Sequence, residues 1–262
     1  MSPPLLRCQG LAVRYGARTL VQGLDLELYA GERWALVGPN GAGKSSLLLV
    51  LAGARAPDAG SVSLAERPLA EWGVESLAGL RSLVTDRWVD AFALSVREAV
   101  HLARYRLQSG LHSRTHPDPA AESVVLRCLA AMDCATLAER DIRTLSRGER
   151  QRVALAAALA QETQLALLDE PLSHQDPRHQ VQVLQEFARY APLAMVAALH
   201  DINAAARFAT HALLLAGDGS WQAGPAAQVL TPERLSPLFG TDITQVVVAS
   251  HRVFVSTGGA LA

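Results

Sequence analysis

Residues 38–45 have the glycine spacing of a loop that binds phosphate groups. They read Gly-Pro-Asn-Gly-Ala-Gly-Lys-Ser and fit the pattern G-x-x-x-x-G-K-[ST]. Small residues let successive backbone N–H groups point at phosphate oxygens, and the amino end of a following helix adds positive potential. We expect Lys44 to reach the β- and γ-phosphates of a nucleotide and the Ser45 hydroxyl to ligate magnesium. The predicted nucleotide-binding residues are Gly38, Pro39, Asn40, Gly41, Ala42, Gly43, Lys44, Ser45 and Ser46.

Asp169 and Glu170 are the two carboxylates that a hydrolytic magnesium–nucleotide site requires. They follow residues 165–168, an apolar run typical of a buried strand. Acidic pairs often lie on solvated surfaces, but at the end of a buried strand unpaired carboxylates would cost free energy. We expect Asp169 to hold magnesium, directly or through water, and Glu170 to polarise the attacking water. The pair therefore predicts hydrolysis of ATP.

A strand and a helix are needed to position the loop, and the residues on either side of it predict both elements. Apolar residues 34–37 form a short strand pattern that stops at Gly38, and a leucine-rich helix pattern over residues 44–52 ends at Gly53. After residue 160, strand and helix patterns alternate, which predicts a parallel sheet covered on both faces. Further strands are expected at residues 24–29, 81–85, 165–168, 193–199 and 212–215, and helices near Pro177 and Asp201.

Helical patterns dominate the middle of the chain. Ser95 precedes Glu98 by three residues, and Ser146 precedes Glu149 in the same way. This spacing is that of a capping box, in which serine and glutamate satisfy each other's backbone N–H groups at a helix start. Two helix starts are therefore predicted. Residues 110–119 are expected to form an exposed connection, and strand-like runs at 245–249 and 252–256 have no predicted place in the fold.

The composition excludes several classes of protein. Half of the 262 residues are apolar and 19% are charged, which excludes a disordered or collagen-like chain. The 24 basic residues nearly balance the 25 acidic ones, which argues against a nucleic-acid-binding protein. Residues 153–160 and 193–199, the longest apolar runs, have 8 and 7 residues against the ~20 of a membrane span. No secretory signal is recognised, so a cytoplasmic location is expected.

Lysine and cysteine are both scarce. Lys44 is the only lysine among the basic residues, and arginine supplies all the others. The three cysteines are an odd number without metal-ligand spacing, so neither a disulfide framework nor a zinc site is expected. Cys8, Cys128 and Cys134 are predicted to be small buried thiols.

Residues 145–152, Leu-Ser-Arg-Gly-Glu-Arg-Gln-Arg, resemble the signature sequence Leu-Ser-Gly-Gly-Gln of the ATP-binding cassette (ABC) ATPases and its basic continuation. The resemblance implies a dimer of two cassettes, head to tail, in which each signature helix points its amino end at the γ-phosphate bound by the other chain. Ser146, Gly148 and Glu149 would then contact the partner's nucleotide. Ser146 alone would more often be only a helix cap.

The same resemblance covers nearly the whole chain and implies its fold. It predicts an α/β P-loop NTPase core with a mostly parallel sheet, antiparallel strands at the amino end and an inserted helical subdomain. One nucleotide-binding domain is expected over residues 1–262. Its parts would be an ATP-binding core at 1–89 and 160–240, a helical signature subdomain at 90–159 and a strand-like extension at 241–262.

Three single residues match further elements of the family. Tyr15 resembles the aromatic residue that stacks on adenine, although a tyrosine near a strand end is as often simple packing. Asp176 resembles the D-loop aspartate that crosses the dimer interface. His200 resembles the switch histidine that contacts the γ-phosphate, whereas a lone histidine is usually structural.

Two positions depart from the family pattern. Asp86 stands where the Q-loop glutamine is expected; its carboxylate could meet magnesium but would add negative charge beside Asp169 and Glu170. Arg147 replaces the first glycine of the signature and could either crowd the interface or contact a phosphate. Both positions leave a low-turnover nucleotide switch as an alternative to a full ATPase.

The resemblance narrows further to the separate ATPase subunits of importers. Residues 176–180, Asp-Pro-Arg-His-Gln, and residues 229–232, Val-Leu-Thr-Pro, are similar to cassettes that import iron-siderophores, haem or cobalamin. Such a chain works as a homodimer beneath transmembrane permease subunits, peripheral on the cytoplasmic face of the membrane, and indirectly serves an extracytoplasmic substrate-binding protein. The alternative is a soluble cassette ATPase that acts on nucleic acid or the ribosome. Those cassettes usually carry two phosphate loops or a long coiled coil, and neither is present.

Overall fold

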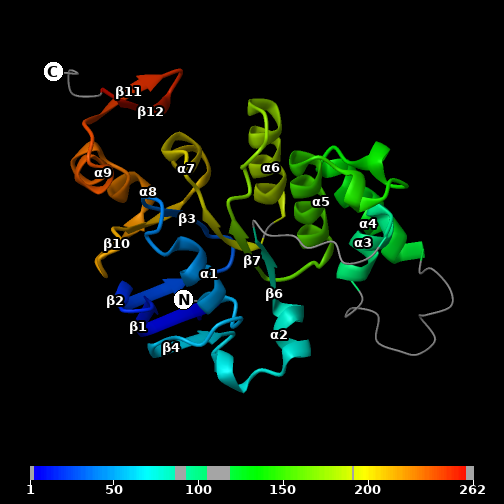
Figure 1. The fold of residues 1–262 in the computed structure, drawn as a ribbon, viewed down its shortest axis with the longest axis horizontal. Coiled ribbons are helices and arrows are strands. Elements are labelled where there is room, and N and C mark those ends of the chain that lie inside the picture. The colour runs from blue at the N-terminus through cyan, green and yellow to red at the C-terminus, as the bar shows by residue number, and fades with distance from the viewer. Residues whose placement is uncertain (1–2, 86–92, 105–118, 191, 258–262) are drawn as a thin grey trace. The chain divides into compact units, whose positions relative to one another are not determined.

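The computed structural model describes residues 3–85, 93–104, 119–190 and 192–257 (Figure 1). The chain forms two compact units. Unit one comprises Met1–Trp72, Leu167–Asp169 and Ala194–Ala262, and unit two comprises Gly73–Ala166 and Glu170–Leu193. The domain bounds expected from the sequence stay a prediction. Asp86 and most of the connection at 110–119 lie outside the described residues.

The amino-terminal strands of unit one form an antiparallel sheet, as predicted. β1 (Leu6–Tyr15) lies between β2 (Arg18–Leu28) and β4 (Ala59–Leu64), and β5 (Arg67–Pro68) extends the edge. The strand pattern expected at residues 24–29 is the last part of β2, in which buried apolar residues alternate with exposed polar residues. One face of this sheet therefore belongs to the core and the other to solvent.

The second sheet is mostly parallel and has the strand order β10-β9-β3-β8-β7-β6. β3 pairs in parallel with both β8 and β9, whereas β10 is antiparallel to β9. All residues of β7 and β8 are buried, as expected for central strands of a covered parallel sheet. The bounds are β3 (Arg33–Val37), β6 (Arg81–Val84), β7 (Leu165–Asp169), β8 (Ala194–Ala198), β9 (His211–Leu215) and β10 (Trp221–Pro225).

The helix after the glycine loop, α1 (Lys44–Leu51), ends where the sequence predicts. Gly53 has a left-handed φ of 69°, and its N–H donates to the Val50 carbonyl at 3.0 Å. The Ala54 N–H donates to the Leu49 carbonyl at 2.9 Å, which completes a Schellman motif. The other helices of unit one are α7 (Ile202–Phe208), α8 (Ala226–Val229) and α9 (Pro232–Phe239).

The two strand-like runs at the carboxyl end form a hairpin of their own. β11 (Ile243–Val248) pairs antiparallel with β12 (His251–Ser256), and the hairpin lies beyond α9 in Figure 1. The Asn203 side chain on α7 joins it to the rest of unit one, because it donates to the Phe254 carbonyl and accepts from the Phe254 N–H. The hairpin is thus anchored to the helix that begins just after His200.

Unit two is mainly helical. Helices α3 and α4 both pack against α5, and Figure 1 shows the three side by side. Its helices are α2 (Val74–Leu80), α3 (Val96–Ala103), α4 (Pro119–Ala131), α5 (Arg147–Ala160) and α6 (Pro177–Arg189). Both predicted capping boxes are confirmed. Ser95 caps α3 with Glu98, and Ser146 caps α5 with Glu149.

The capping boxes predict how stability depends on pH. Backbone N–H donation from Ser95 and Ser146 holds the pKa of Glu98 and Glu149 below that of an ordinary glutamate. Because the unfolded chain binds more protons, this stabilisation is present above about pH 4.3 and is lost as pH falls through the folded pKa. Urea unfolding should show that Glu98→Gln/Glu149→Gln is less stable than the wild type at pH 7, with a difference that shrinks toward pH 3. A difference independent of pH would contradict the assignment.

Candidate nucleotide-binding site

The glycine loop lies between β3 and α1, the strand–loop–helix arrangement predicted from the sequence. Gly41 and Gly43 have φ values of 77° and 100°, which favour glycine. Gly43 is the N-cap of α1, and the helix has neither a side-chain cap nor an acidic residue in its first turn. The amino end of α1 therefore keeps its positive potential, as an anion site requires.

Residues of β2 and β9 pack closely against the glycines of the loop. A Cβ atom on Gly43 would lie 2.8 Å from the Cβ of Leu20 on β2, and one on Gly38 would overlap the Leu215 carbonyl oxygen at the end of β9. A Cβ on Gly217 would lie 2.9 Å from Cα of Ala42. These contacts leave no room for side chains at the three glycines, so only glycine fits this loop conformation.

Lys44 is buried at the start of α1, with 6% of its surface exposed. Its Nζ donates to the Gly38 carbonyl at 2.8 Å and to the Pro39 carbonyl at 3.1 Å. The ammonium group thus lies within the loop, where the sequence pattern places the phosphates. Ser45 is exposed on the same first turn, and Ser46 is half-buried.

Asp169 and Glu170 follow each other at the end of β7, as predicted. Asp169 is buried, with 7% exposure, and Glu170 is half-buried with a left-handed φ of 50°. A non-glycine residue in this conformation costs on the order of 1 kcal/mol, a kind of strain that is common at functional sites. The Glu170 carboxylate accepts from the Ser173 hydroxyl at 3.0 Å. Its conformation is therefore fixed by local contacts.

His200 and the loop lie at the same edge of the second sheet. β3 and β8 are parallel neighbours in which Leu36 pairs with Ala198, and the loop and His200 each follow two residues later. His200 is exposed, and the next residue, Asp201, caps α7 by accepting from the Asn203 N–H at 2.7 Å. Ligands of parallel α/β sheets bind at the carboxyl ends of the strands, which is where this histidine lies.

Tyr15 ends β1, and 74% of its surface is exposed. The ring is therefore not part of the core, which removes the packing alternative for this residue. It lies just before the turn that leads into Arg18 at the start of β2. A flat, exposed aromatic side chain in unit one is available to stack on a base.

The signature residues begin α5 within unit two. The Ser146 hydroxyl accepts from the Glu149 N–H at 3.3 Å, and the Ser146 N–H donates to the Glu149 carboxylate at 2.8 Å. Arg147 is exposed at the first helical position. Gly148 has no space for a side chain, because a Cβ there would lie 2.6 Å from the His174 carbonyl oxygen.

Asp176 caps α6, which begins at Pro177 as the sequence predicts. It accepts from the His179 N–H at 2.9 Å, and this bond holds the pKa of the Asp176 carboxyl below its usual range. The His179 ring lies between two carboxylates, 2.9 Å from Asp176 and 3.2 Å from Asp133. Asp176 is therefore linked through His179 to Asp133, two residues after the end of α4.

Arg18 is a part of the site that the sequence patterns do not mark. Its Nε donates to the Gly217 carbonyl at 2.9 Å, and Gly217 in turn lies against Ala42 of the loop. The guanidinium also lies near Gly41, since a Cβ on that glycine would be 3.8 Å from Arg18 Nη1. In the sequence, the only signal for this role is that Arg18 closely follows Tyr15. Its hydrogen-bond partner, the Gly217 carbonyl, is 199 residues away.

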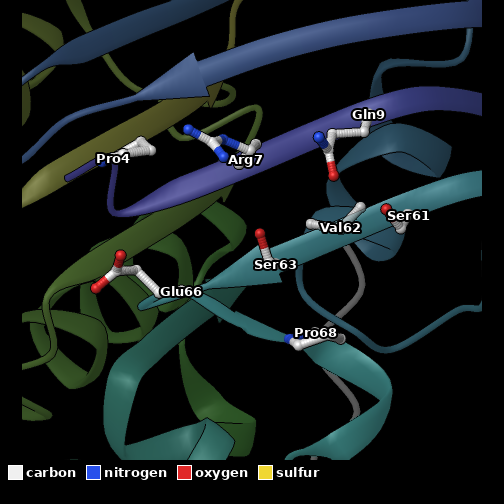
Figure 2. Close-up of a pocket in the computed structure, with 8 residues that line it drawn as sticks. All are labelled: Pro4, Arg7, Gln9, Ser61, Val62, Ser63, Glu66 and Pro68. Atoms are coloured by element: carbon white, nitrogen blue, oxygen red, sulfur yellow. The ribbon is translucent and has the colours of Figure 1, made fainter.

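A polar groove lies on the outward face of the antiparallel sheet. Figure 2 shows that Arg7 and Gln9 of β1 and Ser61 and Ser63 of β4 line it. Arg7 forms an ion pair with Glu27 at 2.7 Å. The groove contains none of the predicted site residues.

Other potential chemistry is limited in the described part of the chain. No group of three or more His, Cys, Asp or Glu residues there could hold a metal ion by itself. None of the described helices is long and apolar enough to span a membrane. The three cysteines are buried, as predicted. Burial raises the pKa of Cys8 to about 12 and that of Cys134 to about 11, which disfavours the reactive thiolate form of both.

Comparison with known proteins identifies relatives over most of the chain. The family model for ABC transporters matches residues 21–173. The hemin import ATP-binding protein HmuV of Thermobifida fusca is 37% identical over 249 residues, which are 94% of this chain and 85% of the relative. HmuV of Pseudomonas aeruginosa is 39% identical over 247 residues, 91% of this chain and 94% of the relative.

Solved structures agree with this likeness. An inward-facing metal-chelate type ABC transporter matches with a TM-score of 0.82 and 27% identity, covering 99% of this chain and 100% of the other. A dimeric bacterial ABC transporter cassette matches with a TM-score of 0.74 and 22% identity, covering 84% and 98%. The second match shows the fold alone. The predicted α/β P-loop cassette fold is confirmed.

The packing behind the loop predicts the effect of a single methyl group. Gly43→Ala places a Cβ against Leu20 at a φ that disfavours alanine, so we expect ATP affinity to fall about 10-fold in a fluorescent-nucleotide titration. The matched control is Gly23→Ala, which has a φ of 62° but no neighbour within 4 Å of the new atom. It should lose about 1 kcal/mol of unfolding free energy and keep its ATP affinity. Equal affinities for both variants would show that the loop tolerates the contact.

Proposed function

The chain belongs to the ABC transporter family, and from this premise we propose that it is the ATP-hydrolysing subunit of an importer for haem or a related iron chelate. The observation that carries the proposal is the likeness to hemin import ATP-binding proteins along nine-tenths of the chain. The site supports it, because the phosphate loop, the acidic pair and the signature helix are all formed. The permease of an importer selects the cargo, so the residues of this ATPase subunit do not identify it. The haem assignment is therefore inferred from the names of the relatives.

ATP would bind through residues 38–46, with Lys44 on the β- and γ-phosphates. The burial of Lys44 inside the loop supports this role, because a buried cation favours an anionic ligand. Tyr15, exposed at the end of β1, would stack on the adenine. His200 would contact the γ-phosphate from the carboxyl edge of the sheet that the loop shares.

The donors present fit a magnesium ion. Mg²⁺ prefers hard oxygen ligands and keeps several waters, and unit one offers the exposed Ser45 hydroxyl and the buried Asp169 carboxylate. When bound, the ion would neutralise charge on the phosphates. Glu170 would take the proton of the attacking water as general base. Asp86 stays a proposed further ligand.

A homodimer would complete each site. In the head-to-tail arrangement of two copies, Ser146, Gly148 and Glu149 would face the partner's nucleotide, and Asp176 would lie at the interface. The exposure of Ser146 and Arg147 at the start of α5 supports this placement, because an N-terminal helix turn attracts phosphate. ATP-driven closure of the dimer would move the permease, and hydrolysis would reopen it. The subunit would thus be peripheral, on the cytoplasmic face of the membrane, and would serve an extracytoplasmic binding protein indirectly.

Replacement of the proposed base separates hydrolysis from binding. Glu170→Gln should lower kcat by about 10²–10⁴-fold, because the amide cannot accept the proton, and should keep its ATP affinity. A phosphate-release assay and a nucleotide titration measure the two quantities. Glu75→Gln, on α2, removes a carboxylate that is not among the proposed site residues and should leave both unchanged. Wild-type turnover in Glu170→Gln would refute the base assignment, and absence of turnover in the wild type would favour the nucleotide-switch alternative.

The transport assignment predicts a membrane partner. The tagged chain, pulled from detergent-solubilised native membranes, should bring down a polytopic permease in stoichiometric amount, identified by mass spectrometry. In proteoliposomes the pair should take up haem only with internal MgATP, and Glu170→Gln should abolish uptake. Recovery of ribosomal or DNA-associated proteins alone would overturn the transport proposal and leave the ATPase site standing.

A further inference from the structure

Gln175 lies in the segment of chain that connects β7 to α6, and its polar side chain is buried. Only 8% of its surface is exposed, although glutamine is rarely buried without partners. Its Nε2 donates to the Gly148 carbonyl at 2.9 Å, and its Oε1 accepts from Arg152 Nη1 at 3.2 Å. Both ends of the amide are therefore bonded to α5, one to its first turn and one to its second.

Two more contacts join the same elements. The His174 carbonyl lies so close to Gly148 that a Cβ there would be 2.6 Å away, and Gln151 Nε2 donates to the Glu170 carbonyl at 3.4 Å. All these residues belong to unit two. Residues 170–175 therefore contact the first two turns of α5 at several points. Among these contacts, Gln175 is the residue whose side chain bonds to α5 through both its N–H donor and its oxygen acceptor.

We infer that Gln175 is a positioning residue that couples the signature end of α5 to the carboxylate of Glu170. The inference rests on the proposed function, in which α5 meets the partner's nucleotide while Glu170 acts on the nucleotide of its own chain. A displacement of α5 when the dimer closes reaches Gly148 and Arg152 and, through the Gln175 amide, the segment that holds Glu170. Binding at one site of the dimer thereby sets the hydrolytic geometry of the other.

Loss of this amide has a definite physical consequence. Without it, Arg152 Nη1 loses an acceptor and the segment loses the bond that fixes its distance from Gly148. A buried hydrogen bond contributes enough to change an equilibrium about 10-fold. The described hydrogen bonds of the amide go to α5. Its loss should therefore affect turnover and coupling more than the affinity of the phosphate loop for ATP.

The chain offers a matched pair of glutamines for the test. Gln175→Met keeps the length of the side chain and removes both hydrogen bonds. The control is Gln182→Met on α6, because Gln182 Nε2 also donates to a backbone carbonyl at 2.9 Å, that of Ala131 at the end of α4. Gln182 contacts neither α5 nor residues 170–175 through a described hydrogen bond. Both variants would be measured for urea stability, kcat, half-saturating ATP concentration and Hill coefficient.

We expect Gln175→Met to lower kcat about 10-fold and to reduce the Hill coefficient toward 1, with the half-saturating ATP concentration within two-fold of wild type. Gln182→Met should lose similar stability and keep all three kinetic values. Equal kinetics for the two variants would overturn the inference, because the effect of Gln175 would then be general destabilisation.

A second variant keeps the test decisive if Gln175→Met does not fold. Gln175→Glu retains the acceptor for Arg152 and cannot donate to the Gly148 carbonyl, so it should show the same loss of kcat and cooperativity. Wild-type kinetics in a folded Gln175→Glu would overturn the positioning role of the Gly148 bond. Failure of the proposed function has a different signature. In that case the wild type and Gln182→Met would also lack MgATP-dependent turnover and cooperativity.

Discussion

Close packing against the glycines in and around the phosphate loop is the constraint on which the rest of this structure depends. Gly43 lies against the Leu20 side chain of β2, Gly38 against the end of β9, and Gly217 against Ala42, so none of these three positions has room for a Cβ atom. With the loop fixed in this way, Lys44 can be buried among its carbonyl groups, and α1 can begin with its N–H groups uncapped. A charged side chain and an open helix end would each cost free energy in another setting. Here both are suited to hold an anion.

The sheet and the helical unit contribute different kinds of positioning. In the sheet, the parallel pairing of β3 and β8 brings the loop and His200 to one edge. In unit two, positions are fixed by side chains: the Ser146 capping box sets the start of α5, and Asp176 with His179 sets the start of α6. Backbone pairing is insensitive to single substitutions, whereas side-chain links can be removed one at a time. The helical unit is therefore the part in which the position of a functional group can be tuned.

Local patterns predicted the elements that depend on neighbouring residues. The phosphate loop, both capping boxes, the end of α1 at Gly53 and the buried strand before Asp169 all follow from spacings of a few residues. The sequence did not reveal what depends on distant pairing. The place of the carboxyl-terminal hairpin requires Asn203 to meet Phe254, and the role of Arg18 requires a carbonyl 199 residues away. No periodicity encodes such contacts, because they arise only once the sheet has formed.

The single lysine has a consequence for chemical labelling. Every other basic side chain is an arginine, whose guanidinium stays protonated and does not acylate under conditions that modify amines. An amine-directed reagent therefore meets two classes of target in this protein, the α-amino group of the chain and a buried ammonium bonded to the Gly38 and Pro39 carbonyl groups. Acylation of Lys44 requires the phosphate loop to open. The extent of modification at this one position thus reports the opening of the loop in solution, without interference from surface lysines.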